Sequence, residues 1–288
     1  MIHSLPILER MSKQSFITDP GSLSYLYNEL PDDLPSLCGV VRGLVRHRSM
    51  GWLYGYTVPE SEKAEADTRE IELILARILQ RNSAPLFIER PWEDKFVGYC
   101  RVSAVLLCSL ARAKGHAICA RAGFSAYAGQ GIGQANWDHW ICEYWNAQQQ
   151  RWIFIDPEED AKIQDIEGVI FDPFDIPRNL FVSPGEAWLA YRSGSASSYQ
   201  FGLDEEHAGS QYIRMQLLRD IAAMNHWEAT VLDCWGLGTL AEQDITSEEL
   251  ALLDEIAHAD AKGCSSVEAI QNLYLSYPRL RAPLLTYH

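Results

Sequence analysis

The stretch Phe96–Gly115 reads FVGYCRVSAVLLCSLARAKG and decides how the rest of the chain is interpreted. Its apolar residues recur at helical spacing to about Lys114, and Gly115 follows as a helix-ending glycine. The pattern predicts a buried helix with a cysteine, Cys100, in its first turn. Because the N-terminus of a helix carries partial positive charge, a thiolate at this place is stabilised. We therefore expect the tip of the helix to be exposed and reactive.

After Gly115 the pattern changes to that of strands. Three segments rich in β-branched and aromatic residues are separated by loop and turn residues: ICARAGFSAYA, WICEYW and RWIFID. A helix followed by an antiparallel sheet predicts an α+β fold. Further helices are expected at about 22–29, 34–47 and 61–81, and in PGEAWLAYR, YIRMQLLRDIAAMNHWEA, SEELALLDEIAHA and SVEAIQNLYLSY.

The return of helical patterns near Ser183 predicts two parts of the chain, with PRNLFVSPG between them. We expect residues 1–182 to form the core together with the N-terminal helices. Residues 183–288 are expected to form a mostly helical region that packs on this core.

Composition narrows the class of protein. The chain has 288 residues, and it has neither a run of about 18 apolar residues nor a positively charged apolar leader at Met1. Seven cysteines, an odd number without a C-x-x-C pair, favour reduced thiols over disulfides or a zinc knuckle. These features predict a cytoplasmic protein outside the membrane.

The formal net charge of −15 bears on the partner. An acidic surface gains no counterion-release energy from a polyanion, so nucleic acid and anionic membranes are disfavoured. A peptide, a protein or a small amide is the expected partner.

A β-hairpin is predicted at 137–157, where two aromatic-rich strands flank the polar stretch NAQQQ. A turn centred on Ala147 and Gln148 places His139 opposite Asp156 on one face of the sheet. A register two units longer pairs His139 with Glu158 and leaves Asp156 one diagonal step away. In both registers an imidazole lies within reach of a carboxylate.

A cysteine, a histidine and a carboxylate together support nucleophilic attack on an acyl carbon. An imidazolium next to Cys100 lowers the pKa of the thiol, and the imidazole then protonates the leaving group. A carboxylate on the far ring nitrogen fixes the tautomer and the orientation of His139.

Three segments in this order, GYCRVSAVLLCSLARAKGHAICARAGFSAY, DHWICEYW and RWIFIDP, resemble the successive motifs of the transglutaminase-like superfamily. These Cys/His/Asp enzymes share a papain-type core, in which the helix that bears the nucleophile packs on an antiparallel sheet. The resemblance implies Cys100 as nucleophile, His139 as general base and acid, and Asp156 as orienting carboxylate. The segments RDIAAMNHWE and DCWG also look like longer bacterial members of unassigned activity.

The chain departs from this family at positions that wall the cleft. Many members have an acidic and then an aromatic residue at the positions of Val102 and Ser103. They also carry a small residue and then a Trp after the histidine, where this chain has Trp140 and Ile141. The resemblance therefore leaves the substrate open.

Three other sequence patterns resemble phosphate, calcium or zinc sites but lack features that such sites need. The glycine-rich GQGIGQ at 129–134 lies between two strands, so no helix N-terminus is available for a phosphate. DPEEDAKIQDIE, starting at Asp156, resembles a calcium loop but lacks its glycine and carries Lys162 within the loop. The Cys/His/Asp set could ligate zinc, but no fourth ligand stands at metal spacing. We expect neither a metal nor a cofactor.

Two functions remain. The first is cysteine-dependent acyl transfer on an amide through a thioester, with water or an amine as acceptor. The second is a catalytically silent relative that binds a peptide or protein partner.

Overall fold

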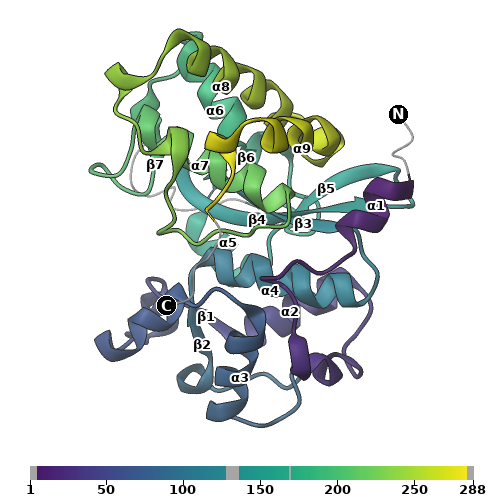
Figure 1. Cartoon of the computed structure of the whole chain (residues 1–288). Helices are drawn as coiled ribbons and strands as arrows, with labels where there is room; N and C mark the ends of the chain where they lie inside the picture. Colours follow the sequence, from purple (N-terminus) through teal and green to yellow (C-terminus); the bar gives the residue numbers. More distant parts are fainter. Residues whose placement is uncertain (1–4, 128–135, 169, 284–288) are drawn as a thin grey trace. The chain divides into compact units, whose positions relative to one another are not determined.

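The computed structural model describes residues 5–127, 136–168 and 170–283 (Figure 1). Helices and a largely antiparallel sheet form a mixed architecture, so the α+β prediction is confirmed. Among the described residues, no helix is both long and apolar enough to cross a membrane.

The chain divides into two compact units. Unit 1 comprises Met1–Ala120 and Trp140–Ile176, and unit 2 comprises Arg121–His139 and Pro177–His288. The sheet order is β5-β4-β3-β6, with β7 paired to β4, and strands β3 (Ile118–Ser125) and β4 (Asn136–Asn146) contribute residues to both units. The predicted GQGIGQ loop lies outside the described residues.

Unit 1 contains the predicted helix of the opening stretch, here α4. Its other elements are mostly helices, with a two-stranded parallel sheet of β1 and β2. They are α1 (Leu5–Met11), η1 (Gly21–Tyr27), α2 (Leu34–Leu44), β1 (Val45–His47), η2 (Gly51–Tyr54), η3 (Glu60–Asp67), α3 (Ile71–Arg81), η4 (Trp92–Asp94), β2 (Phe96–Gly98), α4 (Cys100–Ala113), β5 (Arg151–Ile155) and α5 (Ala161–Glu167).

Helix α4 forms the centre of unit 1. Every residue from Cys100 to Arg112 is buried, and α4 packs on α2 and α3. Gly115 adopts φ 84°, the left-handed conformation expected just past the helix. The sequence therefore predicted this element and its end correctly.

Two N-terminal predictions need correction. The helix expected over 34–47 ends at Leu44, and its last three residues form β1, where Val45 pairs with Phe96 of β2. The helix expected over 61–81 is a 3₁₀ helix, η3, followed by a separate α3. Extended Thr68 breaks the helix, and Arg101 of α4 binds the Thr68 carbonyl.

The β4–β5 hairpin has the longer of the two predicted registers. Cys142 pairs with Ile155 and Asn146 with Arg151, so the turn has four residues, Ala147–Gln150, and the two-residue turn was wrong. Asn146 accepts hydrogen bonds from two N–H groups of this turn, both at 3.0 Å. Gln150 closes the turn with φ 52°. A two-residue turn would leave these local bonds unmade.

Unit 2 is mostly helical after its strands, as the sequence indicates. Its elements beyond the shared strands are η5 (Arg178–Leu180), β6 (Phe181–Val182), α6 (Pro184–Arg192), η6 (Ser198–Gln200), β7 (Phe201–Gly202), α7 (Ser210–Met224), η7 (Gly236–Gly238), η8 (Glu242–Asp244), α8 (Ser247–Asp260), η9 (Gly263–Ser266), α9 (Val267–Ser276) and η10 (Pro278–Leu280).

The division of the chain differs from the boundary expected between 182 and 183. Unit 2 begins its last segment at Pro177 and also takes Arg121–His139 from the middle of the chain. Strand pairing explains this: Phe124 of β3 pairs with Val182 of β6, and Asn136 of β4 pairs with Phe201 of β7. A boundary at one point of the sequence cannot describe such a unit.

A buried charge cluster joins four elements of unit 2. Arg121 of β3 binds both carboxylate oxygens of Asp220 on α7, at 2.7–3.1 Å, and lies 3.5 Å from Asp260 at the end of α8. The Ala122 N–H donates to Asp220, and the Gly185 N–H at the start of α6 donates to Asp260. Burial and the neighbouring Asp220 charge raise the pKa of Asp260. Arg121 thus has a structural role in unit 2.

Candidate functional site

Cys100 is the first residue of α4. It follows the extended N-cap residue Tyr99, whose side chain makes no capping hydrogen bond. Because Cys100 is the first residue of this 14-residue helix, the positive end of the helix dipole lies at its thiol. The expectation of an exposed tip was wrong: Cys100 is only 8% exposed, and Arg101 is 2% exposed. Arg101 donates to the Thr68 and Arg69 carbonyls and is therefore an anchor for the start of the helix.

Strand β2 brings the chain close to the first turn of α4. A Cβ on Gly98 would stand 2.8 Å from the Cβ of Val102 and 3.0 Å from Cγ1 of Val45, so only glycine fits there. Gly98 pairs with His47 of β1, and the His47 ring lies edge-on to Tyr99 at 6.1 Å. The His47 imidazole, which no sequence motif indicates, is therefore a neighbour of the residue before Cys100.

Asp156 directly follows β5 and is fully buried. Its N–H donates to the Pro173 carbonyl at 2.9 Å, and its Oδ1 accepts the Glu158 N–H at 2.8 Å. The carboxylate thus fixes the first residues of the loop Asp156–Asp160. Asp160 ends this loop by capping α5, since its Oδ1 accepts the N–H groups of Lys162 and Ile163.

Two side chains from neighbouring helices hold the same loop. Ser103, one turn after Cys100 on α4, donates to Glu158 Oε1 at 2.8 Å. Arg42 of α2 donates to the carbonyls of Pro157 and Glu159 at 3.2 and 3.3 Å. The first turn of α4 and the loop that begins with Asp156 are therefore joined by a direct hydrogen bond.

His139 lies on β4 and belongs to unit 2, whereas Cys100 and Asp156 belong to unit 1. It is 8% exposed, and its ring stands edge-on to Tyr127 with centroids 5.8 Å apart. Its neighbour Asp138 is half-buried and accepts the Tyr212 hydroxyl at 2.6 Å. Burial raises the pKa of Asp138. The structure thus joins the first turn of α4, which begins at Cys100, to the loop that begins at Asp156. The participation of His139 in this site stays a prediction.

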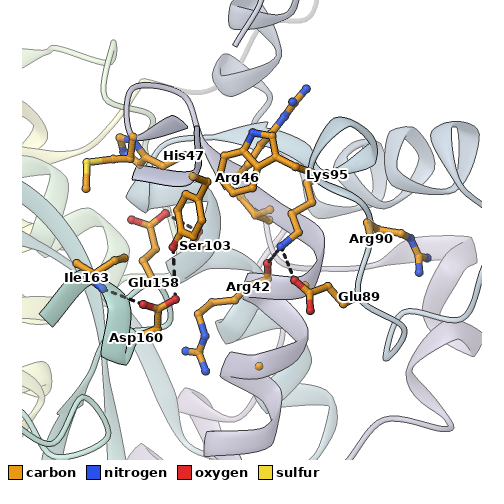
Figure 2. Close-up of a pocket in the computed structure, with 16 residues that line it drawn as sticks. Arg42, Arg46, His47, Glu89, Arg90, Lys95, Ser103, Glu158, Asp160 and Ile163 are labelled. Carbon is orange, nitrogen blue, oxygen red and sulfur yellow. Dashed lines mark hydrogen bonds and ion pairs between the residues drawn. The ribbon is translucent and has the colours of Figure 1, made fainter. Parts of the chain in front are cut away.

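A cavity of about 470 Å³ lies within unit 1 beside this loop (Figure 2). Ser103, Glu158 and Asp160 line one part of it, and Cys100 is not among its lining residues. Figure 2 shows Glu158 and Asp160 near Ser103, whereas Lys95 and its partner Glu89 lie on the opposite side. Its volume is in the range of small-molecule and side-chain binding pockets.

Most of these lining residues carry no sequence pattern that predicts a site. Ser103 was noted only as a departure from a family pattern, although its position one turn after Cys100 places it on the same end of α4. Glu158 entered only as an alternative partner of His139. Arg42 and Tyr54 lie far away in the sequence, and no local pattern connects them to Asp156.

The other cysteines differ from Cys100 in their surroundings. Burial raises the pKa of Cys38 to about 12 and also raises that of Cys142, whose sulfur lies 3.7 Å from that of Cys108. Cys108, Cys119 and Cys142 are core residues, since all three are fully buried. Cys234 is exposed.

These environments predict selective alkylation. At about pH 6.5, brief iodoacetamide treatment is expected to modify Cys100 ahead of the thiols with no exposed surface, because Cys100 keeps 8% of its surface exposed and lies at the positive end of α4, where a thiolate is stabilised. Peptide mapping by mass spectrometry measures the order of labelling. Cys234→Ser is the background for this experiment, since it removes an exposed competitor. Equal labelling of Cys100 and Cys38 would contradict the prediction.

Comparisons of this chain with models of protein families, with curated proteins and with solved structures find no match.

Proposed function

We propose that this protein transfers an acyl group from an amide through a thioester on Cys100. His139 serves as general base and acid, Asp156 orients it, and the surrounding fold is a papain-type core. The observation that carries the proposal is the place of Cys100 at the first residue of buried α4, with the Asp156 loop bonded to the same turn through Ser103 and Glu158.

The chemistry proceeds in two balanced steps. The Cys100 thiolate attacks the amide carbon, a C–S bond forms, and the C–N bond breaks as the imidazolium protonates the departing amine. Water or a second amine, deprotonated by the imidazole, then attacks the thioester carbon and releases the thiolate. Water gives hydrolysis, and an amine gives transamidation.

A thioester on Cys100 is the direct test. The full chain is incubated with libraries of peptide and small amide substrates, and intact mass followed by peptide mapping locates the added acyl group. We expect an adduct on Cys100 that hydroxylamine removes, because hydroxylamine cleaves thioesters. Cys100→Ser is the matched control and should show no hydroxylamine-sensitive adduct. An adduct that persists in this variant, or lies on Cys234, would refute the assignment.

The second candidate is a catalytically silent binding protein. The observation in its favour is that the cavity of unit 1 is lined without Cys100. This candidate predicts that ligands bind equally well to the natural chain and to Cys100→Ser, while no acyl adduct forms on either.

A further inference from the structure

The cavity of unit 1 carries an uneven distribution of polar groups. Glu158 is half-buried, and its Oε1 accepts from Ser103, while its Oε2 accepts no hydrogen bond from the residues that the structure describes. Asp160 adds a second carboxylate whose Oδ2 lies 3.3 Å from the Tyr54 hydroxyl. One end of the cavity therefore presents negative charge with acceptor capacity left over.

In the part of the chain that the structure describes, the arginine and lysine side chains of the lining donate to groups other than the Glu158 and Asp160 carboxylates. The Lys95 ammonium binds Glu89 and the Arg42 carbonyl at 2.9 and 2.7 Å, and the Arg46 guanidinium binds Glu62. Arg90 donates to backbone carbonyls of its own loop. Arg42 donates to the Pro157 and Glu159 carbonyls of the loop that carries Glu158, and in Figure 2 the guanidinium of Arg90 points away from Glu158 and Asp160. The end of the cavity near Glu158 thus keeps its negative charge.

An aromatic wall next to these carboxylates already holds a cation. Tyr54 stacks on Trp92 with ring centroids 4.5 Å apart, and both residues line the cavity. The ammonium of Lys162 lies 4.2 Å from the centroid of the Tyr54 ring. Because Lys162 is exposed on α5, its side chain can leave this face without unfolding the helix. Tyr54 is therefore a cation-binding face that the chain occupies with its own ammonium.

We propose that this cavity binds a cationic side chain, that of arginine or lysine, in the substrate of the acyl-transfer reaction. Glu158 pairs with the cation, the Tyr54 face covers it, and Lys162 competes with it. The inference rests on the proposed function, since it names the class of peptide that presents an amide to Cys100. The acidic net charge of −15 raises the local concentration of such cationic peptides.

The test separates charge from shape and binding from catalysis. Isothermal titration calorimetry compares Nα-acetyl-arginine amide with Nα-acetyl-citrulline amide, which has almost the same shape and no charge. The protein is the full chain with Cys100→Ser, so no acyl transfer consumes either probe. We expect the arginine probe to bind about tenfold more tightly than the citrulline probe, as for a partly desolvated charge pair.

Two variants locate the effect in this cavity. Glu158→Gln keeps an acceptor for Ser103 and should bring the arginine probe down to the affinity of the citrulline probe. Lys162→Ala should strengthen binding of the arginine probe several-fold, because the competing ammonium is gone. Glu248→Gln, an exposed carboxylate of α8 in unit 2, is the matched control and should change neither affinity.

Several outcomes would overturn the inference. These are equal affinities of the two probes, no binding of either at millimolar concentration, or an arginine preference that survives Glu158→Gln in a variant with unchanged thermal unfolding. Absence of a thioester on Cys100 together with a Glu158-dependent arginine preference would refute the proposed reaction and support the cation site. A thioester on Cys100 without that arginine preference would support the proposed reaction and refute the cation site.

Discussion

Arg121→Met is expected to lower the free energy of unfolding by about 3–5 kcal/mol, the usual cost of removing one partner from a buried ion pair. Arg121, Asp220 and Asp260 have side chains with no exposed surface, and the variant leaves two buried carboxyl groups without their cation. Urea unfolding followed by circular dichroism measures this loss.

The loss should depend on pH in a defined direction. Without Arg121, the pKa of Asp260 in the folded state rises further above the unfolded value of about 3.9, because burial favours the neutral acid and the cation that opposed this effect is gone. When a carboxyl group has a higher pKa in the folded state than in the unfolded state, its contribution to stability is fully present below the unfolded-state pKa. This contribution is lost as the pH rises through the folded-state pKa. The variant should therefore lie closer to the natural chain at pH 4 than at pH 8.

Glu9→Ala provides the control, since it removes a salt bridge to Lys13 that is exposed on both sides. No measurable change in unfolding is expected for this variant. A loss below about 1 kcal/mol for Arg121→Met, or a loss that does not vary with pH, would show that the cluster is not a paired buried charge system.

Loss of activity is the second large effect, expected once a substrate is identified through the Cys100 adduct. Cys100→Ala and His139→Ala should each reduce kcat/KM by about 10⁴–10⁶-fold, as for a nucleophile and its base that act as one unit. Asp156→Asn should cost about 10⁴-fold, because the imidazole remains but its tautomer is no longer enforced. Steady-state kinetics on purified, folded variants measures these ratios.

His116→Ala is the matched histidine control. The His116 ring contacts the Asp32 carbonyl at 2.6 Å on the surface of unit 1, so its loss should leave kcat/KM within about twofold of the natural value, as is typical away from the reacting groups. If His139→Ala behaved like His116→Ala, the triad would be wrong. His47, which pairs with Gly98 two residues before Cys100, would then be the imidazole to replace.

Helices with strong local signals could be predicted closely from the sequence. Helix α6 occupies the predicted PGEAWLAYR, where Ser183 and Glu186 form a capping box. Helix α8 begins at Ser247 as predicted, because Thr246 and Glu249 form the same motif. The end of α4 followed from Gly115. In these places the residues that set the boundary are neighbours in the sequence.

The features that the sequence did not predict depend on distant partners. The hairpin register depends on Asn146 and Gln150, and strand alternation alone fits a two-residue turn equally well. Burial of Arg101 requires carbonyls of Thr68 and Arg69, more than 30 residues earlier. Glu158 acquires its role from Ser103, 55 residues away. Such contacts follow from the fold and leave no local pattern.

Because unit 2 is built from two separate segments of the chain, its folding during translation depends on when the second segment is synthesised. Arg121 and Asp220 are 99 residues apart, so at about 5–20 residues per second the arginine emerges roughly 5–20 s before its carboxylate exists. Strands β3 and β4 likewise precede β6 and β7, their partners within this unit. During that interval the segment Arg121–His139 has open strand edges and an unneutralised charge. Unit 2 therefore completes its folding only late in translation. Before that point, a chaperone that shields strand edges has the largest exposed strand surface to cover.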